Sequence, residues 1–284
     1  MKYFKFFLKH TTLYYVLWTL LLIVLSCLPI FLFPPSDALR KVFSYVILCI
    51  GLCAMQLPIA KQWQQLNQSL TEQNNPILYL QQTDFLFSGI DLTVMLARAG
   101  ASGSYWRALM LNRVKAFCDL YQFEDALSVF RFLQANAKHM PPINMAVIYH
   151  NLAYIYAKYN DFSLAEYYFE QERAAWQTVK PIGKQRKAQI QALLMDTEAI
   201  LASSRGDFAR AEPLYRQIEA HTQSQSHLSS TQKVGLAFEF GEMYFRMGNY
   251  AEAVPRLQFA AQYGGTTYFR AEAERLLSQI QMGR

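Results

Sequence analysis

The chain has 284 residues, of which 52% are hydrophobic, 15% aromatic and only 17% charged. This composition excludes a disordered chain, a collagen and a small disulfide scaffold, and the length suits one large domain or two modest ones. The formal net charge of +6 is uneven, because residues 1–61 hold 6 Lys/Arg and 1 Asp/Glu whereas residues 62–284 hold 21 and 20. Nucleic acid is not expected as a partner, since the larger part is nearly neutral and lacks the basic face that phosphates require.

Two apolar runs near the N-terminus predict a helical hairpin. Residues 13–33 contain no charge, and as a helix they would rise about 31 Å, close to the hydrocarbon thickness of a bilayer at about 30 Å. Residues 42–60 form a second, weaker run, separated from the first by the stretch PPSDALRK. We therefore expect a membrane domain over residues 1–61 with two transmembrane helices (about 13–33 and 42–60), and a lipid membrane as a partner.

Basic residues predict the orientation of this hairpin. Its outer ends carry Lys2, Lys5, Lys9 and Lys61, against Arg40 and Lys41 in the turn. The positive-inside rule then places both termini, and the large domain, on the cytoplasmic side of the cell (inner or plasma) membrane. A cleaved lipoprotein is the alternative, because VLSC ending at Cys27 faintly resembles the bacterial lipoprotein cleavage box. The apolar run continues beyond Cys27, however, and is longer than that of a signal peptide.

Residues 62–104 are interpreted as a helical connector. Trp63, Leu66 and Leu70 recur at helical spacing, which predicts that the second span continues as a helix. The sequence Asn74-Asn75-Pro76 predicts a stop. Residues 77–98 are again predicted to be helical, and GASGS at 100–104 is predicted to be a break or flexible joint.

Residues 105–284 carry internal repeats. In four units, at 107–140, 146–179, 192–225 and 234–267, a turn aromatic is followed by Ala after three residues and by an aromatic or Leu four residues later. The sets are Phe123, Ala126 and Phe130; Phe162, Ala165 and Phe169; Phe208, Ala211 and Tyr215; and Tyr250, Ala253 and Leu257. This spacing predicts pairs of helices that cross at Ala, and these pairs must stack because no single pair buries its own apolar face.

The clearest unit also places Tyr149, Leu152-Ala153 and Tyr156 ahead of Phe162, and so resembles the tetratricopeptide repeat. The resemblance covers about residues 105–282, with 268–282 as a capping helix. The Ala anchors lie 39, 46 and 42 residues apart, against a family period of about 34, and a helical solenoid of another family is the alternative. The expected fold is all-α: an N-terminal transmembrane helical hairpin followed by an α-solenoid of about four helix pairs.

The resemblance implies a concave groove, lined by the first helix of each pair, that binds a protein or peptide partner. By repeat position the groove residues are Leu111, Lys115, His150, Tyr154, Asp196, Ile200, Phe238, Glu242 and Phe245. Aromatic anchors with charges of both signs suit such a partner. The function expected is a membrane-anchored scaffold or adaptor. The alternatives are a regulatory protein that senses a ligand or peptide and an extracytoplasmic lipoprotein-like scaffold. The sequence does not indicate an oligomeric state.

No arrangement of residues predicts an enzyme. The His residues are scattered, and a phosphate-binding glycine loop and a nucleophile elbow are both missing. We therefore expect no catalytic residue, cofactor or metal. Glu166, Glu170 and Glu172 recur at helical spacing and are interpreted as a solvated face. One basic cluster, Lys180, Lys184, Arg186 and Lys187, is predicted to contact anionic lipid headgroups, with a solvated loop as the alternative.

Overall fold

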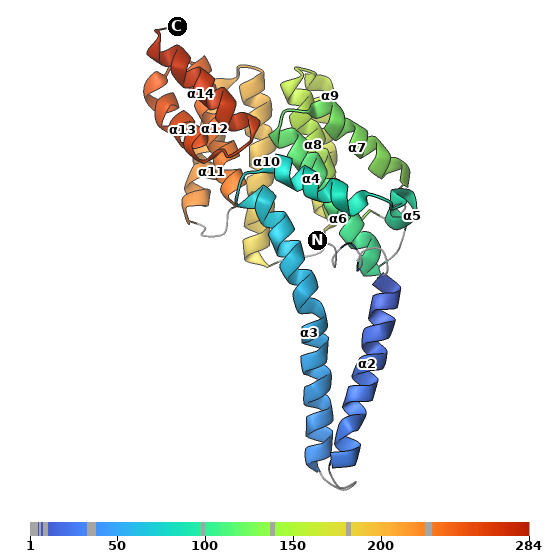
Figure 1. Ribbon diagram of the computed structural model, residues 1–284. Helices are drawn as coiled ribbons and strands as arrows, with labels where there is room; N and C mark the ends of the chain where they lie inside the picture. Colours follow the sequence, from blue (N-terminus) through green and yellow to red (C-terminus); the bar gives the residue numbers. More distant parts are fainter. Residues whose placement is uncertain are drawn as a thin grey trace. The chain divides into compact units, whose positions relative to one another are not determined.

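The computed structural model describes residues 5, 7, 11–32, 38–97, 100–136, 140–179, 183–224 and 229–283. Within these residues the regular structure is helical, with helices α2 to α14 and no strand (Figure 1). The all-α class expected from the sequence is therefore confirmed. The chain divides into two compact units, one formed by residues 1–67 and 84–91 and the other by residues 68–83 and 92–284.

The first unit contains α2 (Thr11–Leu32) and most of α3 (Ala38–Thr71). Many apolar side chains of these two helices are exposed. They include Leu13, Val16, Leu17, Leu20, Leu21, Ile23 and Val24 in α2, and Val42, Tyr45, Val46, Leu48, Ile50 and Leu57 in α3. Both apolar runs of the sequence thus form helices, as predicted.

The transmembrane assignment is not supported. A span requires about 20 consecutive and predominantly apolar residues, and none of the helices in the described part of the chain meets the combined requirement of length and apolarity. The multi-pass localisation in the cell membrane, which was expected from residues 13–33 and 42–60, is therefore not supported.

The connector is helical with two corrections, and the first is that the helix predicted over residues 77–98 is interrupted at residues 88–91. The helix α3 ends at Thr71, and α4 (Pro76–Phe87) begins after the predicted stop, where the Asn75 side chain accepts a hydrogen bond from the Leu78 N–H at 3.0 Å. The helix α5 (Leu92–Leu96) follows. The predicted break at GASGS is wrong, because α6 (Gly100–Asp119) begins there. Glycine in a helix costs only about 1 kcal/mol, and burial of Trp106 and Leu109 in α6 offsets it.

Four helix pairs and a final helix follow. The pairs are α6 with α7 (Phe123–Asn136), α8 (Pro142–Lys158) with α9 (Phe162–Thr178), α10 (Lys184–Ser204) with α11 (Phe208–Ser224), and α12 (Ser230–Arg246) with α13 (Tyr250–Tyr263). The last helix is α14 (Tyr268–Gln281), which packs against α12 and α13 (Figure 1). Each turn aromatic is the first residue of the second helix in its pair. The prediction of successive helix pairs with a terminal helix, an α-solenoid in general terms, is confirmed.

The turns inside the four pairs share one backbone conformation. The residue two positions before the turn aromatic has a positive φ in each: Tyr121 at 61°, Asn160 at 60°, Gly206 at 82° and Gly248 at 74°. The next N–H donates to the carbonyl five residues earlier at 2.9 Å, from Gln122 to Phe117, Asp161 to Tyr156, Asp207 to Ala202 and Asn249 to Tyr244. These are the bonds of the Schellman motif, which satisfies the carbonyls at a helix end. The repeat therefore extends from side-chain spacing to backbone geometry.

The core between the pairs is apolar and closely packed. The crossing residues Ala126, Ala165, Ala211 and Ala253 are all fully buried. Phe240 stacks on Tyr215 and Tyr244 at centroid distances of 5.1 and 4.7 Å. At Gly241 an added Cβ would lie 3.1 Å from the Leu257 side chain, so a small residue is needed where α12 approaches α13.

Candidate functional site

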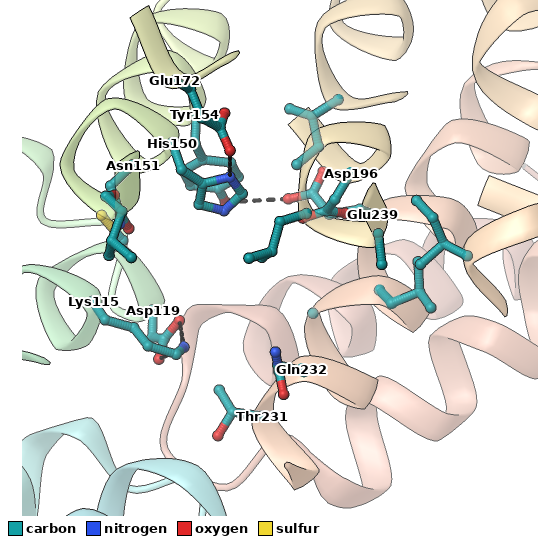
Figure 2. Close-up of a pocket in the computed structure, with 18 of the residues that line it drawn as sticks. Lys115, Asp119, His150, Asn151, Tyr154, Glu172, Asp196, Thr231, Gln232 and Glu239 are labelled. Carbon is teal, nitrogen blue, oxygen red and sulfur yellow. Dashed lines mark hydrogen bonds and ion pairs between the residues drawn. The ribbon is translucent and has the colours of Figure 1, made fainter. Parts of the chain in front are cut away.

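A cavity of about 510 Å³ lies among the first helices of all four pairs, α6, α8, α10 and α12, with contributions from α9, α11 and α14. Six predicted groove residues line it, namely Leu111, Lys115, His150, Tyr154, Asp196 and Ile200. Figure 2 shows polar side chains on opposite sides of this space, with His150, Asp196 and Glu239 on one side and Lys115, Asp119, Thr231 and Gln232 on the other. Its volume falls within the range of about 300–1,000 Å³ that is usual for ligand pockets.

The predicted groove residues of α12 lie elsewhere. Phe238 is buried against Phe269 at a centroid distance of 5.3 Å, and Phe245 is partly buried against Tyr250. Glu242 pairs with Lys158 at 3.1 Å. The residues of α12 that line the cavity are Thr231, Gln232, Gly235, Leu236 and Glu239. The face of α12 toward the cavity is therefore rotated from the predicted one, because Phe238 packs more favourably in the core.

His150, on α8, is held by groups from two other helices. Its Nδ1 lies 2.8 Å from the Thr197 Oγ1 and 3.4 Å from the Glu172 carboxylate. Thr197 in turn donates to Glu172 at 2.9 Å. Burial lowers the pKa of His150, but the carboxylates of Glu172 and Asp196 together raise it above its ordinary value. The arrangement therefore favours an imidazolium between two acids.

A second ion pair lies on α6. Lys115 donates to both carboxylate oxygens of Asp119, at 2.9 and 2.7 Å. Burial raises the pKa of Asp119 above its ordinary value, while Lys115 acts in the opposite direction. The ammonium of the predicted groove residue Lys115 is therefore paired with an acid one helical turn away on the same helix.

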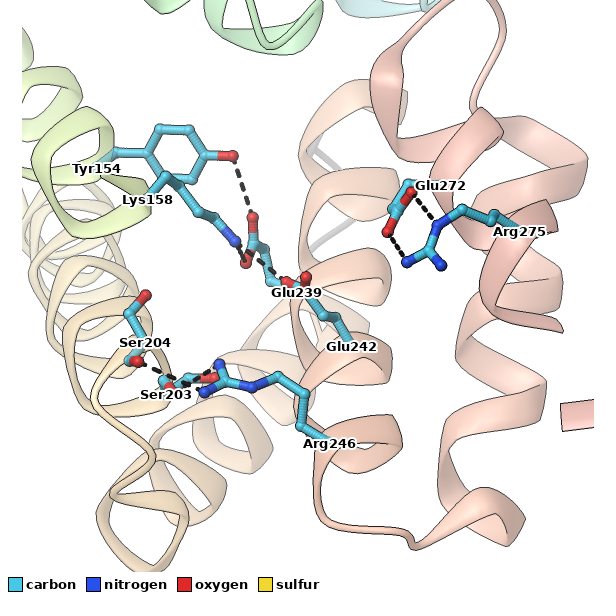
Figure 3. A network of polar contacts seen from close by, with 9 residues as sticks. All are labelled: Tyr154, Lys158, Ser203, Ser204, Glu239, Glu242, Arg246, Glu272 and Arg275. Atoms are coloured by element: carbon cyan, nitrogen blue, oxygen red, sulfur yellow. Dashed lines mark hydrogen bonds and ion pairs between the residues drawn. The ribbon is translucent and has the colours of Figure 1, made fainter. Parts of the chain in front are cut away.

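A third polar network joins α8 to α12 (Figure 3). The Lys158 ammonium lies 2.6 Å from Glu239 and 3.1 Å from Glu242, and the Tyr154 hydroxyl donates to Glu239 at 3.1 Å. Burial raises the pKa of Glu239, with Lys158 opposing it. In the same view Arg246 donates to the Ser203 carbonyl at 2.9 Å, near the end of α10. The contacts of Lys158 and Tyr154 connect the second pair to the fourth, and the Arg246 bond connects the fourth pair to the third.

Sequence reasoning placed Asp196 in the groove but missed three other acids of the cavity, Asp119, Glu172 and Glu239. Glu172, interpreted as part of a solvated face, is fully buried, whereas the side chains of Glu166 and Glu170 are 57% and 64% exposed. The correction follows from the partners of Glu172, His150 and Thr197, which lie on other helices and compensate its burial. The repeat pattern likewise did not indicate that Glu239 lines the cavity.

The basic cluster is described only in part. Lys180 lies outside the described residues, and α10 begins at Lys184, so Arg186 and Lys187 belong to its first turn; of these side chains Lys187 is described, and it is exposed. The expected contact with lipid headgroups depended on the membrane localisation that the helices do not support.

In the described part of the chain, no group of three or more His, Cys, Asp or Glu side chains is arranged to hold a metal ion. Comparison with protein-family models, with curated proteins and with solved structures yields no significant match. No family is identified by these comparisons. In its described part the chain is an all-helical, repeat-like protein with a cavity lined by apolar and charged residues.

Proposed function

We propose that this chain is a non-enzymatic binding protein whose tetratricopeptide-like repeats receive a peptide segment of a partner protein in the cavity. The observation that carries the proposal is the position of the cavity, which is bordered by the first helix of every pair. Successive first helices present side chains to one shared space, which is how helical repeat proteins form binding surfaces. The lining combines apolar residues with a few polar groups of both signs, a composition that orients a bound ligand.

A regulatory protein that senses a small ligand or peptide is the second candidate. The volume of about 510 Å³ favours it, because a space of this size accommodates a small molecule or a few side chains rather than a folded partner. In this case binding would shift the contacts of α8 with α12, since Tyr154 and Glu239 belong both to the cavity wall and to the network with Lys158.

The test is to fill the cavity. Ala192 on α10 lines the cavity, and Ala192→Leu places an isobutyl group in it. The matched control is Ala251→Leu at an exposed position of α13. We expect peptides selected from a library by the full chain to lose affinity for the Ala192→Leu variant and to retain it for the control, as measured by titration calorimetry. Equal affinity of selected peptides for both variants contradicts the proposal.

A further inference from the structure

One acid of the cavity wall, Asp196, takes part in none of the ion pairs found among the described residues. Among the described residues, Lys115 pairs with Asp119, His150 with Glu172, and Lys158 with both Glu239 and Glu242. Asp196 lines the same cavity and has no ion pair there, although the charge of His150 acts on it. Figure 2 shows Asp196 on the same side of the cavity as His150 and Glu239. The four carboxylates of Glu172, Asp196, Glu239 and Glu242 face only two cations, His150 and Lys158, in these contacts, so this side of the cavity carries an excess of negative charge.

Two other side chains of the cavity have unused hydrogen-bonding capacity. Glu172 is fully buried, and its Oε1 has no hydrogen bond in the described structure, since the His150 contact at 3.4 Å is an ion pair of loose geometry. Trp176 is 9% exposed, and its indole N–H also has no acceptor among the described residues. Both residues line the cavity. A buried polar atom without a partner is costly, so these two atoms point to a ligand that brings a donor and an acceptor.

We infer that the cavity takes a ligand carrying an ammonium or guanidinium group on an apolar stem, with Asp196 as its counter-charge. Leu111, Ile200 and Leu236 line the same space and offer apolar surface to the stem. The Glu172 Oε1 accepts a hydrogen bond from the cation, and the Trp176 N–H donates to a neighbouring acceptor such as a peptide carbonyl. This inference rests on the proposed function and specifies its ligand.

Electrostatics support the same ligand class. Burial raises the pKa of Asp196 above its ordinary value, because the ionised carboxylate is poorly solvated there. The negative charge of Glu172 raises this pKa further, and the charge of His150 acts in the opposite direction. A cation bound beside Asp196 replaces the lost solvation, and a charge-assisted hydrogen bond is about twice as strong as a neutral one. Two sources share this chemistry: a free amine and a Lys or Arg side chain of a peptide.

The experiment compares probes of similar size whose end groups are positive, neutral or negative. Titration calorimetry of the full chain would use 1-aminopentane, 1-pentanol and pentanoate as small probes, and the blocked peptides Ala-Lys-Ala, Ala-Gln-Ala and Ala-Glu-Ala as peptide probes. We expect the cationic member of at least one set to bind about tenfold or more tightly than its neutral member. Binding of 1-aminopentane alone identifies a small amine as the source, and binding of Ala-Lys-Ala identifies a peptide side chain; both results support the inference.

Two variants make the test specific to Asp196. Asp196→Asn keeps the shape of the side chain and removes its charge, and we expect it to abolish the preference for the cation. Asp125→Asn, the same change at an exposed position of α7, should leave the preference intact. Thermal denaturation of both variants checks that each is folded. Probes that bind the original chain without regard to charge, or an unchanged preference in Asp196→Asn, overturn the inference but leave the proposed function standing. The proposed function fails separately, when filling the cavity at Ala192 leaves peptide affinity unchanged.

Discussion

The core between the helix pairs and the wall of the cavity are built from the same helices by different forces. In the core, Phe240, Tyr215 and Tyr244 stack on one another, and each second helix crosses its partner at a fully buried Ala. In the wall, buried acids such as Glu172 and Glu239 depend on cations that come from other helices. The core is thus stabilised by the hydrophobic effect, which scales with buried area and is not directional. The wall depends instead on a few ion pairs and hydrogen bonds of defined geometry.

This difference teaches where the chain has freedom to acquire function. Apolar burial packs the two helices of each pair against each other, whereas the polar contacts of the wall connect one pair to another. The wall therefore tolerates charges that are costly to bury, and an incompletely compensated set, as at Asp196, is expected at a site that receives a ligand rather than in a core.

The largest expected effect comes from emptying the core. Phe240→Ala removes a ring that is fully buried between Tyr215 and Tyr244, and we expect the free energy of unfolding to fall by about 4 kcal/mol. Urea denaturation followed by circular dichroism measures it. Tyr167→Ala, at a side chain that is 55% exposed, is the control and should cost about 0.5 kcal/mol or less. Similar losses in the two variants would remove the distinction between core and surface.

A slightly smaller effect is expected from breaking the wall. Lys158→Met leaves the carboxylates of Glu239 and Glu242, with side chains 8% and 28% exposed, without their shared cation. We expect a loss of about 3 kcal/mol in the free energy of unfolding, because a buried charge is left uncompensated. Adding Glu239→Gln should recover about half of this loss, and chemical denaturation of both variants measures the recovery. An additive or larger loss in the double variant would contradict the pairing.

The repeat architecture was accessible to sequence reasoning because its signals are local. The turn aromatics Phe162 and Phe208 lie three residues before their Ala anchors, so one window of sequence contains the turn, the crossing point and the start of the second helix. The shared turn conformation reinforces this signal, since Gly206 and Gly248 mark positions of positive φ.

The burial of Glu172 and Glu239 and the orientation of α12 could not be predicted from the sequence. The partner of Glu172 lies 22 residues earlier at His150, and the partner of Glu239 lies 81 residues earlier at Lys158. The spacing of acids on one helix does not show whether such a partner exists, so Glu172 was wrongly assigned to a solvated face. Phe238 was placed in the groove for a similar reason, because repeat position does not reveal that Phe269 of the last helix covers it.

A smaller effect is expected from replacing glycine by alanine, which should destabilise the chain in a turn and stabilise it inside a helix. At Gly206 the φ of 82° disfavours a side chain although no atom lies within 4 Å of an added Cβ. Gly206→Ala is therefore expected to lower the free energy of unfolding by about 1 kcal/mol through the backbone alone. At Gly235, inside α12, the nearest atom of Phe269 lies 3.7 Å from an added Cβ, and Gly235→Ala should raise it by about 0.5 kcal/mol. Parallel thermal melts test the pair, and a change of the same sign at both positions would contradict the assignment of the turn.

The smallest expected effect is a dependence of stability on pH through His150. Its pKa is raised above the ordinary value in the folded chain, so its contribution to stability is complete below the ordinary pKa and is lost as the pH rises through the folded pKa. The difference in free energy of unfolding between the original chain and a His150→Gln variant should therefore shrink as the pH rises above the ordinary pKa of histidine and through the raised folded pKa, because the comparison removes the titration that both chains share. The groups that act on His150 are Glu172, Asp196 and Lys115. In an Asp196→Asn background one of the two carboxylates is lost, and the same decline should move to lower pH. If the difference does not vary with pH, the imidazole is not held as a cation between the two acids. The charge interactions of His150 would then not contribute to the stability of the cavity wall.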